Sequence, residues 1–102
     1  DWMCAEAVPM WGRAGRGDML QMKLLGANAV RLYGNNPDTD HTTFLDEALK
    51  EGLEVLPGLS DHPYYQQASG SCRTTNYDCF TQVKPLYLKN LNKGFLLMNR
   101  TY

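Results

Sequence analysis

Residues 24–41 read Leu-Leu-Gly-Ala-Asn-Ala-Val-Arg-Leu-Tyr-Gly-Asn-Asn-Pro-Asp-Thr-Asp-His, and this stretch decides the fold that we predict. It opens with the last residues of an amphipathic helical pattern, which Gly26 stops. Residues 29–33 then alternate apolar with polar or aromatic side chains, and Gly34 ends the strand that this alternation predicts. A passage from helix to strand to polar loop is typical of chains that alternate helices and strands.

The two faces of this strand differ in chemistry. Val30 and Leu32 are expected to face one layer, and Arg31 and Tyr33 the opposite layer. Sheets of α/β proteins are usually covered on both faces, so a guanidinium in such a strand must be paired or used. We keep two interpretations: Arg31 belongs to a ligand site, or it is a structural ion-pair partner on a sheet that is not fully covered.

Three successive βα units are the fold that the whole sequence predicts. Short segments that end in Gly26, Gly52 and Gly94 each close a helical pattern and precede an apolar stretch. Parallel neighbouring strands follow from this repetition. Asp18 and Asp40 are expected to cap helices, and Pro85 requires that the last helix start near it or kink there. The predicted strands are 3–8, 28–33 and 53–57, and the predicted helices are 18–25, 41–51 and 81–93.

Composition limits the possible functions. A chain of 102 residues suits one domain, 1–102, whereas a complete eight-stranded α/β barrel needs about 250 residues. The net charge of −1 gives no electrostatic footprint for nucleic acid, and no apolar run is long enough for a membrane span. The glycine-rich stretch 11–17 lacks the spacing of a phosphate-binding loop, and the histidines lack metal-ligand spacing. We therefore expect no cofactor and no metal.

Two features favour a secreted or cell-surface protein. Cys72 and Cys79 bracket a short polar segment of the kind that a disulfide closes in secreted proteins. The sequence Asn99-Arg100-Thr101 matches the N-glycosylation acceptor pattern, with Asn99 as the acceptor. Cys4 has no assigned partner.

The central stretch resembles β-1,3-glucan-active glycoside hydrolases, with family 72 glucanosyltransferases nearest and family 17 glucanases next. Their corresponding segment runs Leu-Gly-x-Asn-x-Ile-Arg-Val-Tyr, followed by an Asp-Pro turn, a histidine and an Ala-Gly-Ile-Tyr-Val strand. In this chain Asn36-Pro37-Asp38 replaces the Asp-Pro turn. The positions that match this pattern are Gly26, Asn28, Arg31, Tyr33, His41 and Gly52.

The resemblance implies the N-terminal part of a (β/α)8 barrel. It implies that Arg31 and Tyr33 shape a sugar site, and we expect Asn35 and Asn36, near the same strand end, to bind substrate as well. Families of this kind use two glutamates near the ends of strands four and seven. None of the four glutamates in this chain follows an asparagine at a predicted strand end. No catalytic residue is therefore assigned, and residues 95–99 are either the start of a fourth strand or a linker.

Two functional hypotheses follow. In the first, the chain is the N-terminal segment of a secreted hydrolase or transglycosylase acting on β-1,3-glucan, inactive by itself and completed by the rest of the barrel or a partner protein. In the second, it is a non-catalytic glycan-binding or structural subunit of a larger assembly. The two are distinguished by whether an Asn-Glu pair follows soon after residue 102 in the gene.

Overall fold

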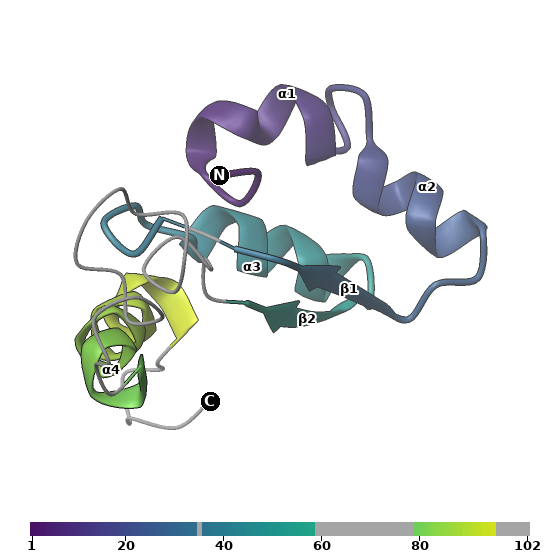
Figure 1. The fold of residues 1–102 in the computed structure, drawn as a ribbon. Coiled ribbons are helices and arrows are strands. Elements are labelled where there is room, and N and C mark those ends of the chain that lie inside the picture. The colour runs from purple at the N-terminus through teal and green to yellow at the C-terminus, as the bar shows by residue number, and fades with distance from the viewer. Residues whose placement is uncertain (35, 59–78, 96–102) are drawn as a thin grey trace.

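The computed structural model describes residues 1–34, 36–58 and 79–95, which form helices around a two-stranded sheet (Figure 1). The elements in chain order are η1 (Ala5–Ala7), α1 (Val8–Trp11), α2 (Asp18–Leu24), β1 (Ala29–Leu32), α3 (Thr42–Lys50), β2 (Glu54–Pro57), α4 (Cys79–Asn90) and the π-helical segment η3 (Leu91–Phe95).

The two strands are parallel and are connected through α3. The register pairs Ala29 with Glu54 and Leu32 with Pro57. The predicted strands 28–33 and 53–57 and the predicted helices 18–25 and 41–51 are therefore confirmed within one or two residues at each end. In the described part of the chain the sheet has two strands, which agrees with βα units but does not form a barrel.

The predicted first strand over 3–8 is wrong. Residues 5–11 are helical instead, and Met3, Ala7 and Trp11 are all buried. These three positions are four residues apart, which is the spacing of one helical face and not of a strand. Pro9 lies in the first turn of α1, where a missing N–H costs nothing.

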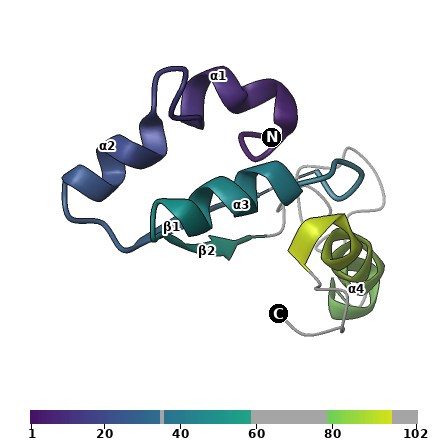
Figure 2. The ribbon, with the colours of Figure 1, turned by 180° about the vertical axis from the view of Figure 1, so that it is seen from behind.

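One face of the sheet carries the core. Val30 is buried together with Met19, Phe44, Ala48 and Leu53. From behind, α3 lies in front of both strands, and from the front the strands lie in front of α3 (Figures 1 and 2). Within the described residues, no helix covers the opposite face of the sheet. Uncovered sheet of this kind explains how a charged residue can occupy the middle of β1.

Of the two aspartates expected to cap helices, only Asp40 binds a backbone N–H at a helix start. Asp40 accepts hydrogen bonds from the backbone N–H of Thr42 (3.3 Å) and from its hydroxyl (2.9 Å) at the start of α3. Asp18 is the first residue of α2 and does not cap it, because its carboxylate is bound by the Arg16 guanidinium at 2.6 and 2.7 Å. The arginine removes the carboxylate from the backbone donors that it was expected to satisfy.

A helix is present where the sequence predicts one over 81–93, but it neither starts nor kinks at Pro85. It begins at Cys79 and runs through Pro85, and the non-helical backbone lies further on, at Lys93 and Gly94. The glycine stops are confirmed, with φ of 95° at Gly26, 69° at Gly52 and 114° at Gly94. The His41 backbone N–H donates to the Lys93 carbonyl at 2.7 Å. The end of η3 is thereby attached to the start of α3.

Candidate functional site

Arg31 and Tyr33 form a stacked pair on the uncovered face of the sheet. The Arg31 guanidinium carbon lies 5.0 Å from the centroid of the Tyr33 ring, which is a cation–π contact. Tyr33 is 81% exposed and Arg31 is also exposed. Arg31 is therefore not buried between two layers, and it lies on the face of β1 opposite Val30, as the alternation predicts. Within residues 1–34, 36–58 and 79–95, Arg31 makes no ion pair.

A shallow depression lies beside this pair. It has a volume of about 330 Å³ and is formed by residues 31–33 and 56–58. The Gly58 backbone N–H donates to the Leu32 carbonyl at 2.7 Å, and a Cβ at position 58 would come within 2.6 Å of the carbonyl oxygens of Leu32 and Tyr33. Glycine at this position lets the two segments that follow β1 and β2 approach closely.

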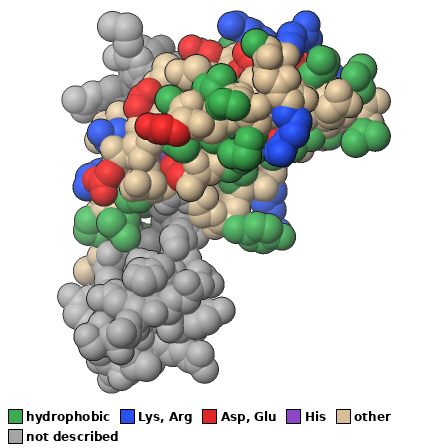
Figure 3. All heavy atoms as spheres, turned by 90° about the horizontal axis from the view of Figure 1, so that it is seen from above, with side chains coloured by type: hydrophobic (Ala, Val, Ile, Leu, Met, Phe, Trp, Pro, Cys, Tyr) green, Lys and Arg blue, Asp and Glu red, His purple; other side chains and the backbone are tan. Residues whose placement is uncertain are grey.

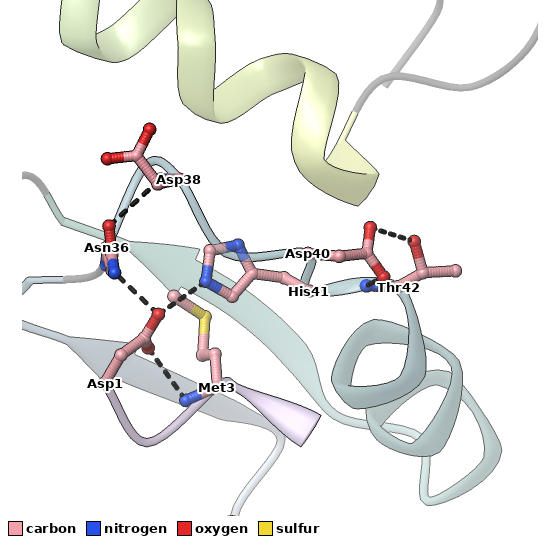
Figure 4. Close-up of polar contacts among 7 residues, drawn as sticks. All are labelled: Asp1, Met3, Asn36, Asp38, Asp40, His41 and Thr42. Carbon is pink, nitrogen blue, oxygen red and sulfur yellow. Dashed lines mark hydrogen bonds and ion pairs between the residues drawn. The ribbon is translucent and has the colours of Figure 1, made fainter. Parts of the chain in front are cut away.

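The loop after β1 is organised by Asp1 (Figure 4). One carboxylate oxygen of Asp1, Oδ2, lies 2.7 Å from His41 Nε2 and accepts the Asn36 backbone N–H at 3.0 Å. The other oxygen accepts the Met3 backbone N–H at 3.0 Å. The Asn36 side chain accepts the Asp38 N–H at 3.0 Å. Two separate segments of the chain, 1–3 and 36–41, therefore meet at one carboxylate.

His41 is the buried member of this cluster. Its side chain has no exposed surface, and among the residues that the structure describes Nδ1 has no hydrogen-bond partner. Burial lowers the pKa of His41 below its ordinary value of 6.5, against the opposing effect of the Asp40 carboxylate. The amino group of Asp1 acts in the same direction as burial.

The glutamates lie away from the carboxyl ends of the strands. Glu51 is held in two contacts by the Arg13 guanidinium, at 2.8 and 3.1 Å, and Glu47 accepts the Arg13 backbone N–H at 3.3 Å. Glu54 is the first residue of β2, and Glu6 belongs to η1. A retaining glycosidase needs two carboxyl groups about 5–5.5 Å apart beside the sugar. These positions give no geometry for such a pair.

The structure brings together some of the predicted site residues. Arg31 and Tyr33 are in contact, and Asn36 follows in the next loop, exposed and anchored through its backbone. Asn35 and Asn99 lie outside the described residues. The predicted Cys72–Cys79 disulfide also involves a residue outside them.

The Asp1–His41 contact was not found by sequence reasoning. In the sequence, His41 is a match to the pattern of the glucan-active families and a histidine without metal-ligand spacing. The usable signal was its place directly before the apolar positions of a helix, where a polar ring becomes buried when the helix packs.

The surface gives few further indications of function. Acidic and basic side chains are interspersed on the face seen in Figure 3, so that face has no broad field of one sign. Among the described residues, no group of histidine, cysteine, aspartate and glutamate is arranged to hold a metal ion. The helices that the structure describes are too short or too polar to span a membrane.

Comparison of the chain with protein-family models, with curated proteins and with solved structures finds no match.

Proposed function

We propose that this chain is part of a secreted protein that binds β-1,3-glucan-type polysaccharide, with Arg31 and Tyr33 as the centre of the sugar site. The observation that supports the proposal is the exposed Arg31–Tyr33 stack on the sheet face opposite the helices. In a closed barrel with its helices outside, that face is the interior, and ligands bind at the carboxyl ends of its strands.

The chemistry of the pair suits a sugar. An exposed tyrosine ring offers an apolar face with a polar hydroxyl at its tip, and the guanidinium offers several N–H donors in a fixed plane. Sugar rings present apolar C–H faces and hydroxyl acceptors, so one side chain covers the ring and the other binds its hydroxyls. Leu56, which is 57% exposed and pairs with Arg31 across the sheet, extends the apolar surface beside them.

We assign the chain no catalytic residue. The first hypothesis, a segment of a hydrolase or transglycosylase barrel, needs catalytic glutamates supplied by the rest of that barrel. The alternative, a non-catalytic glycan-binding or structural subunit, needs the same Arg31–Tyr33 surface but no glutamates. The two hypotheses therefore share the binding site and differ only in whether turnover occurs when the full protein is assayed.

A binding experiment tests the shared part. Chain 1–102 is titrated with laminarin, a soluble β-1,3-glucan, and with soluble starch, an α-linked glucan, by isothermal calorimetry. We expect binding to laminarin that is reduced at least tenfold in Arg31→Met and in Tyr33→Ala, which is a loss of about 1.4 kcal/mol. Lys50→Met and Tyr87→Ala are matched controls, because both residues are exposed elsewhere. Unchanged laminarin binding in the two site variants would contradict the proposal.

A further inference from the structure

His41 joins three segments that are distant in the sequence. Its ring nitrogen Nε2 contacts the Asp1 carboxylate, which also holds the Asn36 backbone N–H. The backbone N–H of His41 donates to the Lys93 carbonyl at 2.7 Å, and its ring lies against Phe95 with the centroids 5.6 Å apart. The start of the chain, the loop after β1 and the end of η3 therefore meet around His41.

The protonation state of His41 decides how many buried hydrogen-bond donors and how much buried charge its ring carries. In the neutral ring, Nε2 carries the proton and donates to Asp1, and Nδ1 is a buried acceptor that has no partner among residues 1–34, 36–58 and 79–95. In the imidazolium, Nδ1 also carries a proton. A buried donor without an acceptor costs more free energy than an under-used acceptor, and a buried charge adds to that cost.

The charged groups around the ring act in both directions. The carboxylates of Asp1 and Asp40 favour the imidazolium, and the amino group of Asp1 opposes it. Asp38, in the same loop, is already paired with Lys89 of α4. Phe95, which faces the ring from η3, carries no charge. The ring is completely buried, and burial lowers the pKa of His41 by more than the Asp40 carboxylate raises it, which favours the neutral form.

We propose that His41 is a pH-sensitive latch, which in its neutral form holds η3 and the Asn36 loop against the start of α3 and on protonation releases them. When the segments separate, the imidazolium gains water and Nδ1–H gains an acceptor. Because an opened His41 binds a proton more tightly than the buried ring, acid shifts the equilibrium toward the opened form. The proposal does not depend on the glycan site, although Asn36 belongs to both.

Nuclear magnetic resonance of chain 1–102 between pH 8 and pH 5 tests the latch. The ring of His41 is followed, with His62→Gln used to assign the two histidines. We expect a titration midpoint below 6.5, because the buried ring is harder to protonate. A midpoint at or above 6.5 would overturn the latch, because acid would then tighten the contact.

Amide exchange reports the release itself. The amides of His41 and Asn36 are bonded across the cluster, whereas the amide of Leu53, which donates to Ala48, is a control. After correction for intrinsic rates, we expect His41 and Asn36 to lose protection by about tenfold for each pH unit between 6.5 and the His41 midpoint, with Leu53 unchanged. Equal loss at all three amides would indicate global unfolding and overturn a local latch.

Two variants separate a latch from a packing role. His41→Gln can donate to Asp1 but cannot titrate, so the pH response of the Asn36 amide is expected to disappear; its persistence would refute the proposal. If His41→Gln does not fold, Asp1→Asn replaces the test. Loss of the carboxylate is expected to lower the His41 midpoint further, and an unchanged midpoint would overturn the proposal, because the Asp1 carboxylate would then not hold the ring.

Discussion

The indole of Trp11 meets the ring of Phe44 edge to face, with their centroids 5.3 Å apart and their planes at 83°. Trp2 approaches the same phenylalanine ring at 5.4 Å and 71°. Edge-to-face contacts between aromatic rings add stabilisation beyond the area that they bury. Phe44 thus joins the N-terminal helical segment to α3, and through α3 to the sheet.

Replacement of Phe44 by alanine is expected to be the most destabilising change in the core. Phe44 is fully buried, so its removal leaves a cavity between two tryptophans and lowers the free energy of unfolding by about 3–5 kcal/mol. Leu49→Ala is the control on the same helix, because Leu49 is 79% exposed and the expected change is within about 0.5 kcal/mol. Urea unfolding followed by tryptophan fluorescence measures both; equal losses would contradict the assigned core.

The contact between η3 and α3 can be tested by replacing Gly94, with Gly26 as the matched control. Both have positive φ, but a Cβ at Gly94 would lie 2.8 Å from the Thr42 backbone nitrogen, whereas a Cβ at Gly26 meets nothing within 4 Å. Gly26→Ala is expected to cost about 1 kcal/mol from backbone strain alone. Gly94→Ala adds the clash with α3 and is expected to cost more. Urea midpoints that are equal for the two variants would show that Gly94 does not contact α3.

The Arg16–Asp18 pair predicts a pH dependence with a defined sign. The hydrogen-bonded Arg16 guanidinium lowers the pKa of the Asp18 carboxyl below its ordinary value of 3.8. A carboxyl whose pKa is lower in the folded state stabilises the fold above its unfolded pKa and loses that contribution as the pH falls toward the folded value. The midpoint of Asp18, followed by nuclear magnetic resonance, is expected to rise toward 3.8 in Arg16→Met. An unchanged midpoint would mean that the pair does not persist in solution.

The periodicity of apolar residues predicts the secondary structure around β1, α3 and β2 correctly, but not that of residues 3–8. The pattern around Val30 predicted the strand, its faces and its parallel partner, because period-two alternation and the flanking glycines agree there. Residues 3–8 contain apolar side chains at mixed spacing, which does not by itself separate a strand from a helix. The four-residue spacing of Met3, Ala7 and Trp11, with proline in the first helical turn, was the signal that favoured a helix.

At the candidate site, the sequence pattern predicts which side chains share a face but not whether that face is buried. Alternation placed Arg31 and Tyr33 on one face, but whether that face is covered depends on the number of strands and helices that the chain supplies. Similarly, nothing local indicated that the Asp1 carboxylate reaches His41, since a contact between residues so far apart in the chain depends on tertiary packing. Residue patterns therefore predicted which side chains share a surface, while their burial required the assembled structure.

The last prediction is that chain 1–102 alone has no glycosidase activity and self-associates. The described glutamates form no acid and nucleophile pair at the carboxyl ends of the strands, so the turnover of laminarin is expected to be absent. Large apolar side chains are exposed, among them Leu25 at 88%, Leu24 at 72% and Phe80 at 73%. Within the described part of the chain, both strands of the sheet also have an edge that is available for further pairing.

Reducing-sugar release and light scattering at increasing protein concentration measure these two properties. Leu24→Lys combined with Leu25→Lys is the matched variant, because it replaces exposed apolar surface by charge without changing the core. It is expected to reduce self-association and to leave the absence of turnover unchanged. Sustained laminarin hydrolysis that disappears when one of the chain's own glutamates is changed to glutamine would contradict the first expectation, because these residues would then form a catalytic pair. A monodisperse wild-type monomer at high protein concentration would contradict the second, because the exposed leucines would then need no partner.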